Sequence, residues 1–321
     1  MKFTKYFDLQ LFANMNTQTT GTSTLSDEMK VYYSDYLIDN AVPKLVHDQF
    51  GQKHPIPKNG GKTIEFRKYS PLPKLLTPLT EGVTPDGQSL TVTTIEATID
   101  QYGGYVTISD MLQLTAIDNN MVQATKLLGN QAGASLDTIT REVLNGGTNV
   151  VYAGGATSRS GLTAENKLTV DDIKKAVRAL KNQNAEKIGD SYVAIIHPDV
   201  TYDLTNDPAW QNVKTYCEPS DWYEGEIGKI AGVRFVETTE AKIFDGGVYS
   251  TLILGDNAYG VTEIEGGGLQ HIVKQLGSAG TADALDQRAT VGWKATKVAE
   301  RLVEQFMVRI ESKCTFNGAA N

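Results

Sequence analysis

Residues 120–147, NMVQATKLLGNQAGASLDTITREVLNGG, carry the strongest periodic pattern in the chain. Apolar side chains recur there at gaps of three or four residues, at Met121, Ala124, Leu128, Ala132, Leu136, Ile139 and Val143. This spacing places them on one face of an α-helix, and two glycines at 146 and 147 are typical of a helix end. We therefore predict a helix with one apolar face, roughly 35 Å long at 1.5 Å per residue.

Two β patterns precede this helix. The stretch Thr63–Ser70, TIEFRKYS, alternates apolar and polar side chains as a half-buried strand does. The pattern resumes at Leu90–Ile99, LTVTTIEATI. The first two apolar residues are at even positions (90 and 92) and the later ones at odd positions (95, 97 and 99), so the two sets would lie on opposite faces of a regular strand. That change indicates a bulge or a strand that is apolar on both faces. The apolar residues that begin the two stretches are Ile64, Phe66, Leu90 and Val92.

A long irregular stretch separates these two strands. Residues 71–89, PLPKLLTPLTEGVTPDGQS, hold four prolines and two glycines, and this composition favours turns and loops. Together the three segments predict an extended two-stranded arm. Because an isolated hairpin is only marginally stable in water, we expect the arm to be stabilised by contacts outside its own domain.

The chain after the long helix predicts an α/β module, over roughly residues 166–268. Thr169 is placed to cap an amphipathic helix, YVAII (residues 192–196) is typical of a buried strand, and HPDVTYDL (residues 197–204) of the helix that follows it. A terminal β segment begins at Gln270 and can share the core of this module. The remaining strands are expected at residues 232–236, 251–254, 271–275, 289–302 and 305–312.

An apolar peptide, FDLQLFA at residues 7–13, precedes a polar run and a helical pattern from Leu25 to Phe50. A secretory signal requires an unbroken apolar core of roughly 7 to 15 residues, which Asp8 and Gln10 interrupt. No later run approaches the roughly 18 apolar residues of a membrane span. We expect the peptide to dock on protein rather than in a membrane, the alternative being a disordered tail. Its apolar residues are Phe7, Leu9, Leu11 and Phe12.

The composition is that of a globular protein, with 40% hydrophobic and 21% charged residues. The net charge of −8 argues against a nucleic-acid-binding surface, because affinity for phosphates comes from Lys and Arg that replace counterions. Much of the acidic excess lies in residues 217–265, which contain ten acidic and only three basic residues. We expect a solvated acidic surface there. Two cysteines are too few for a disulfide scaffold, which favours a reducing cytoplasm.

Three short motifs resemble sites of known chemistry, and each lacks a required part. NGGKT (residues 59–63) lacks the first glycine of a phosphate-binding loop. LGSAG (276–280) is one glycine short of a nucleophile elbow. His197-Pro198-Asp199 is the tripeptide of J-domain cochaperones, but it follows a strand rather than joining two helices, and proline at a helix start explains it. The four histidines show no ligand spacing with either cysteine. We therefore expect no catalytic, cofactor-binding or metal-binding residues.

Taken together, these features resemble the major capsid protein of tailed bacteriophages and prophages, in the short-tailed-phage type found in Gram-positive hosts. The resemblance spans about residues 1–313 and rests on the order of its motifs. These are KYFDLQLFA, the arm TIEFRKYS...LTVTTIEATIDQYGGYVTISDMLQLT, LDTITREVLNGG, YVAIIHPDVTYDL, GEIGKIAGVRFVET and ADALDQRATVGWKATKVAERL.

The resemblance implies an α+β capsid shell fold. Its parts would be an N-terminal arm, an extended two-stranded loop, a peripheral domain with a long spine helix (Asn120–Asn145), and an axial α/β domain. In this chain they would be residues 1–59 (arm), 60–108 (extended loop), 109–165 and 269–321 (peripheral domain) and 166–268 (axial domain).

The resemblance also implies a structural function without catalysis. The chain would self-assemble into hexamers and pentamers of an icosahedral head that encloses double-stranded DNA without sequence-specific binding, and it would assemble in the host cytoplasm into a virion. Expected partners are further copies, a separate scaffolding protein, a portal and a decoration protein, with no membrane. Expected subunit or scaffold contacts are Phe7, Leu9, Leu11, Phe12, Ile64, Phe66, Leu90 and Val92. The alternatives are a bacterial nanocompartment shell protein and, in another class, an α/β enzyme of unknown reaction.

Overall fold

The structure is a computed structural model that describes residues 17–19, 46–79, 81–84, 86–115, 120–211, 228–278, 283–316 and 318–321. The predicted docking peptide lies outside these residues, as does most of the helical pattern predicted from Leu25 to Phe50. The end of that pattern, residues 47–50, is a turn.

The chain divides into two compact units. The first consists of Met1–Gln49, Gln101–Thr138 and Gly266–Lys297, and the second of Phe50–Asp100, Ile139–Glu265 and Val298–Asn321. Helix α3 (Asn120–Asn145) and strand β14 (Arg288–Arg301) each contribute residues to both units. Within the described residues, no helix is both long enough and apolar enough to cross a membrane.

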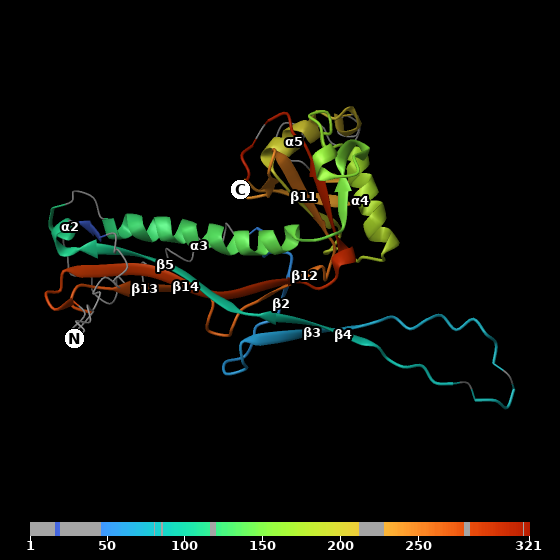
Figure 1. Cartoon of the computed structure of the whole chain (residues 1–321), viewed down its shortest axis with the longest axis horizontal. Helices are drawn as coiled ribbons and strands as arrows, with labels where there is room; N and C mark the ends of the chain where they lie inside the picture. Colours follow the sequence, from blue (N-terminus) through green and yellow to red (C-terminus); the bar gives the residue numbers. More distant parts are fainter. Residues whose placement is uncertain are drawn as a thin grey trace, which may run out of the picture. The chain divides into compact units, whose positions relative to one another are not determined.

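The first unit combines the beginning of α3 with long strands (Figure 1). Strand β14 pairs antiparallel with β13 (Gln270–Lys274) and neighbours β5 (Asp100–Ser109), and β1 (Thr17–Thr19) pairs parallel with β5. A short helix, α2 (Asp110–Thr115), follows β5. The predicted apolar face of α3 is confirmed in this unit, where Met121, Ala124, Leu128, Ala132 and Leu136 are buried. The last two predicted positions, Ile139 and Val143, are half-buried.

A glycine allows β5 and β14 to approach closely. A Cβ atom added at Gly292 would lie 2.9 Å from the carbonyl oxygen of Gly104 and 2.8 Å from the side chain of Tyr105. Any larger residue at position 292 would therefore push the two strands apart.

The second unit contains a sheet in the order β6-β15-β11-β7-β9-β8, with β10 paired to β11. Helices α4 (Val170–Asn182) and α5 (Pro198–Thr205) pack on it, and their shared core includes Ile173, Leu180, Val200, Ile253 and Val308. The strands are β6 (Val150–Tyr152), β7 (Tyr192–Ile196), β8 (Lys229–Ile230), β9 (Val233–Glu237), β10 (Ile243–Phe244), β11 (Val248–Leu254) and β15 (Met307–Ser312).

Several local predictions are confirmed in this unit. The hydroxyl of Thr169 accepts a hydrogen bond from the backbone N–H of Asp172 at 3.3 Å, so Thr169 caps α4. YVAII is the fully buried strand β7. His197 caps α5 and Pro198 is its first residue, so the His-Pro-Asp tripeptide is a helix start. Of the predicted terminal segment, strand β15 pairs with β11 in this sheet, whereas β13 and β14 belong to the other sheet.

A two-stranded hairpin also belongs to the second unit. Strands β3 (Thr63–Tyr69) and β4 (Val92–Thr98) pair antiparallel in an unbroken register, from Thr63 opposite Thr98 to Tyr69 opposite Val92. The parity change predicted in this segment is thus not a bulge within β4. Neither is the strand apolar on both faces, because Leu90 lies before it and Val92 shares its face with Thr94, Glu96 and Thr98. Nearby, β2 (Gln52–Lys53) pairs parallel with β12 (Tyr259–Thr262), which pairs with the end of β14.

Candidate assembly surfaces

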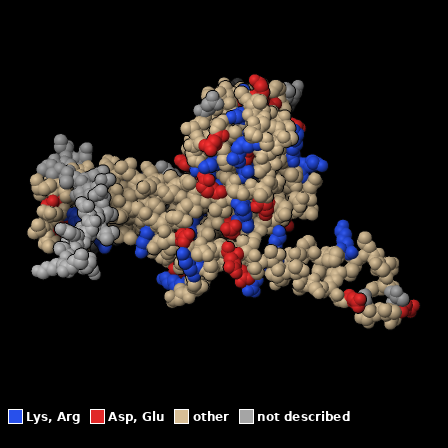
Figure 2. Space-filling model, in the orientation of Figure 1, with Lys and Arg blue, Asp and Glu red and all other residues tan. Residues whose placement is uncertain are grey.

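The segment between β3 and β4, residues 70–91, is here called the hairpin loop. Figure 1 shows it as an open loop beyond the ends of the two strands. Its leucines face solvent, with exposed fractions of 79% at Leu75, 86% at Leu76 and 76% at Leu79. Most of its surface is uncharged (Figure 2). Exposed large apolar side chains gathered on one loop are typical of protein interaction sites.

The structure separates the four predicted contact residues of the hairpin into two pairs. Leu90 and Val92 are exposed, at 68% and 43%, where the hairpin loop meets β4. Ile64 and Phe66 are half-buried and lie opposite Ala97 and Ile95. Leu90 and Val92 are thus the more exposed pair, whereas Ile64 and Phe66 lie partly covered within the second unit and line a groove there.

A groove of about 590 Å³ lies beside β3. We call it the β3 groove. Its apolar lining is Pro55, Ile64, Phe66, Ile95, Leu302 and Val303, and its polar lining is Gln52, His54, Glu65, Arg67, Lys68 and Asn257. The rings of His54 and Phe66 meet edge to face with centroids 5.8 Å apart. This volume lies within the range of ordinary ligand pockets.

A buried charged cluster lies in the first unit, between the turn at residues 47–50, helix α3 and strand β14. The carboxylate of Asp137 accepts a hydrogen bond from the backbone N–H of His47 at 2.8 Å and contacts Nδ1 of His47 at 2.6 Å. The ammonium of Lys297 pairs with Asp48 and donates to the carbonyl oxygen of Leu136 at 2.8 Å. All four charged or titratable side chains are buried. The cluster therefore fixes residues 47–48 against α3 and β14.

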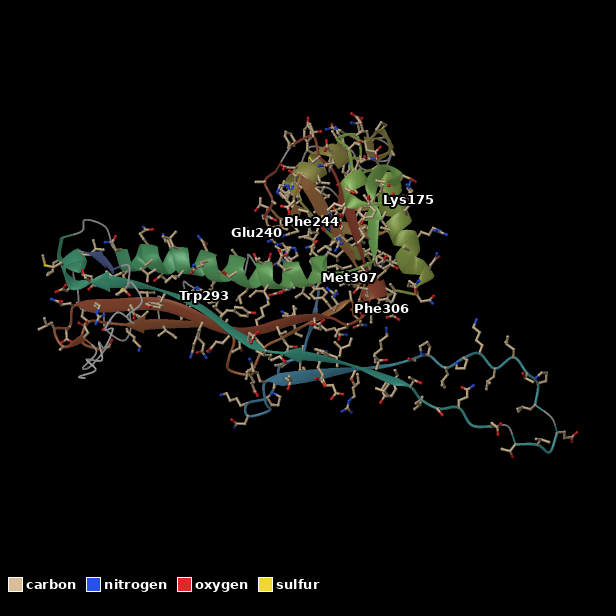
Figure 3. The ribbon with its side chains drawn as sticks, viewed as in Figure 1. Lys175, Glu240, Phe244, Trp293, Phe306 and Met307 are labelled. Carbon is tan, nitrogen blue, oxygen red and sulfur yellow. The ribbon has the colours of Figure 1, made fainter. Side chains whose placement is uncertain are left out.

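A second charged cluster, centred on the buried carboxylate of Glu311, joins the end of α3 to the sheet of the second unit. The carboxylate of Glu311 accepts from Arg159 at 2.7 Å on each oxygen, and from Nε of Arg309 at 2.9 Å. Arg159 stacks on the ring of Phe244, 3.6 Å from its centroid. Figure 3 shows Phe244 and Met307 near the end of α3.

Arg309 completes this second cluster by reaching the end of α3. Its guanidinium donates to the carbonyl oxygen of Gly147 at 2.9 Å and also to that of Asn145. A cation at this position is favourable because the last carbonyls of a helix are unpaired and carry partial negative charge. Burial lowers the pKa of Arg309, and Glu311 opposes that shift.

Sequence reasoning missed these clusters and the floor of the β3 groove. One signal was present: in β14 the buried positions alternate, at Ala289, Val291, Trp293 and Ala295, and Lys297 occupies the next buried position. A lysine at a position of a strand where the alternation otherwise places apolar residues indicates that its charge is buried and paired. No local pattern marks Leu302 and Val303, because they line the groove only through tertiary contact.

Solved capsid structures share the fold of this chain. A capsid structure of the cyanophage P-SCSP1u has a TM-score of 0.67 at 14% identity, and the match covers 84% of this chain and 89% of that one. The capsid of the cyanophage Pam1 has a TM-score of 0.66 at 15% identity, with coverage of 99% and 100%. The capsid of Ralstonia phage GP4 has a TM-score of 0.65 at 16% identity, with coverage of 85% and 89%.

Sequence comparison supplies the family. A search of curated proteins gives no match. The family model described as phage capsid protein matches residues 92–301, which is more than half of the chain. The matched range begins at β4, includes all of α3 and ends with β14. This match and the fold agree, and the chain belongs to the phage capsid protein family.

Proposed function

We propose that this chain is the major subunit of an icosahedral phage head built from its hexamers and pentamers, with the hairpin loop as a contact between subunits. As a member of the phage capsid protein family, the chain is a structural component of a virion, assembles with copies of itself and is not an enzyme. The observation that supports the loop contact is its row of exposed leucines on a hairpin too small to be stable alone.

The finer assignments are also proposals. The regions would be an N-terminal arm (1–59), an extended loop (60–108), a peripheral domain (109–165 and 269–321) and an axial domain (166–268). The head would enclose double-stranded DNA without reading its sequence, which accords with the net charge of −8. A short-tailed phage of a Gram-positive host, assembly in the host cytoplasm, and partnership with a separate scaffolding protein, a portal and a decoration protein complete the proposal.

The N-terminal peptide is proposed as an anchor on a neighbouring subunit or on the scaffolding protein. Phe7, Leu9, Leu11 and Phe12 would be its buried residues. Full burial of one such side chain is worth roughly 1.5–3 kcal/mol before ordering is considered. Replacing Phe7 and Phe12 by Ser should then leave subunit stability unchanged and weaken assembly at limiting protein concentration.

Electron microscopy of the purified protein tests the function, and closed particles are the expected result. The loop contact is tested by replacing Leu75, Leu76 and Leu79 by Ser, since these exposed side chains contribute little to the fold of the subunit. The triple variant should remain folded by circular dichroism and fail to form particles.

A matched control for the loop test changes three exposed polar residues of the same loop, Thr77, Thr84 and Gln88, to Ser. The control should assemble normally. Particles from the leucine variant with the yield of the unmodified protein would contradict the loop contact. Absence of particles from the unmodified protein under all assembly conditions would contradict the head function itself.

A further inference from the structure

We infer that the β3 groove receives the N-terminal peptide FDLQLFA of a second copy of this chain, as an extended strand added to the edge of β3. The inference rests on the proposed anchor function of the peptide and names its receptor.

The groove follows the free edge of a strand. Five consecutive residues of β3 line it, Ile64 to Lys68, whereas β4 contributes Ile95 alone. Consecutive residues of a strand point to opposite faces, so a groove that touches all five runs along the side of the strand. Among the described residues β3 pairs with β4 only. Its other edge therefore offers backbone donors and acceptors to an added strand.

The floor of the groove suits apolar side chains. Phe66, Leu302 and Val303 line it together with Pro55 and Ile95. Close packing under Phe66 is indicated by Gly260, where an added Cβ would lie 3.3 Å from Cζ of Phe66 and 3.4 Å from Cδ1 of Leu302. In FDLQLFA, Leu9 and Leu11 alternate with Asp8 and Gln10. An added strand with this pattern presents both leucines to the floor and the two polar residues to solvent.

The rim of the groove has the charge that complements the peptide. Arg67 and Lys68 are exposed cations on β3, and Glu65 contacts Nε of Arg67 at 3.3 Å. One acid against two bases leaves a positive excess beside the groove. The charged residue of the peptide is Asp8, which comes directly before the first of its two leucines. A carboxylate there is attracted to the rim.

The hairpin loop of a second copy is a poorer occupant than the peptide. Its first nine residues include Pro71, Pro73 and Pro78. Proline has no N–H to donate to a strand edge, so the loop interrupts an added ladder repeatedly. FDLQLFA contains no proline. The peptide is the segment whose backbone and side chains both fit.

Disulfide trapping between full-length chains tests the inference. One chain carries Leu11→Cys and the other Val303→Cys, both with Cys217→Ser; Cys314 is buried. Mild oxidation of the mixture should give a cross-linked pair of unlike chains. The control mixture replaces Val303→Cys by Thr77→Cys, at an exposed position of the hairpin loop, and should cross-link at least several-fold less.

Two outcomes would overturn the inference. They are no cross-link in the mixture, or a cross-link no stronger than that of the Thr77 control. Capture of the peptide by a scaffolding protein alone gives the first outcome. If particles assemble normally and no cross-link forms, the proposed head function is supported and the β3 groove is rejected as the receptor. Failure of this inference can therefore be told apart from failure of the proposed function.

A charge exchange gives a second test that does not depend on the groove floor. Arg67→Glu with Lys68→Glu changes exposed residues and should reduce the trapping yield, by roughly threefold for each exposed charge pair that is removed. Asp8→Lys on the peptide chain should restore the yield. Equal yields for all combinations would contradict the assigned rim, and a reduced yield that Asp8→Lys does not rescue would contradict the pairing.

Discussion

Lys297 and Asp48 form a buried ion pair although 249 positions separate them in the chain. The exposed fractions of their side chains are 6% and 13%. Lys297 also donates to the carbonyl oxygen of Leu136, so one ammonium contacts α3 and the segment that follows the N-terminal region. This pair therefore holds the turn at residues 47–50 against α3 and β14.

Replacing Lys297 by Met should lower the free energy of unfolding by about 3–5 kcal/mol, because it removes the ammonium that pairs with the buried carboxylate of Asp48. Urea unfolding followed by circular dichroism measures this loss. The double variant Lys297→Met, Asp48→Leu should recover most of it, since neither member of the pair is then buried without the other.

A matched control for Lys297 is Lys62→Met. Lys62 pairs with Asp100 at 2.9 Å, but their side chains are 65% and 61% exposed. Exposed pairs contribute about 0–1 kcal/mol. Equal effects of the two lysine substitutions would show that the buried pair does not have the assigned role.

Glu311→Gln should destabilise the second unit by a similar amount, about 3–5 kcal/mol, because Arg309 would lose its buried counter-charge. Arg159→Gln should have a smaller effect, since the Arg159 side chain is 41% exposed and Glu311 retains Arg309. Thermal unfolding of the three proteins gives the order. An Arg159 variant less stable than the Glu311 variant would contradict it.

The thiol of Cys314 should be inert in the folded protein. Burial raises its pKa to about 12, although a backbone hydrogen bond with Phe316 opposes the shift. At pH 8 the thiolate, which is the reactive form, is then on the order of one molecule in ten thousand. Labelling with iodoacetamide, located by mass spectrometry, should leave Cys314 unmodified under native conditions and modify it in urea. Rapid native labelling would show that the C-terminal segment opens.

Two histidines should make stability fall in mild acid. Burial lowers the pKa of His271 and of His197 below the ordinary value, although Asp199 and Glu237 partly oppose it at His197. The unfolded chain therefore binds protons more readily than the folded one below about pH 6.5, and stability is lost as the pH falls through that range.

His271→Gln should reduce the difference between the urea midpoints at pH 7 and pH 5. The control is His54→Gln, since His54 is exposed. An unchanged difference in the His271 variant would assign the acid sensitivity to other groups.

Local patterns in the sequence were sufficient for the elements whose burial has a simple period. Helix α3 follows from its apolar spacing, and the Thr169 cap and the Pro198 helix start follow from residue type. The alternation at Ile64 and Phe66 also indicated half-burial correctly. It did not indicate what covers them, because the covering residues come from distant parts of the chain.

The clusters and the groove required the tertiary structure for the same reason. Glu311 lies in a strand whose every residue is buried, so its burial has no period to detect. Its partners, Arg159 and Arg309, come from a short 3-10 helix (Arg159–Gly161) and from the same strand. Whether a charge is buried and paired depends on contacts between segments far apart in sequence, which propensity and spacing do not report.

The prolines of the hairpin loop have a thermodynamic consequence. Pro71, Pro73 and Pro78 hold their own φ angles near −65° whether or not the loop touches another molecule. A loop that becomes ordered in a contact loses conformational entropy, and each proline reduces that loss by about 0.4–1 kcal/mol. If the proposed contact between subunits orders the loop, the same reduction would apply to each copy added to a shell. The loop would then enter that contact as a partly stiffened chain, and more of the free energy from its leucines would remain to hold neighbouring copies together.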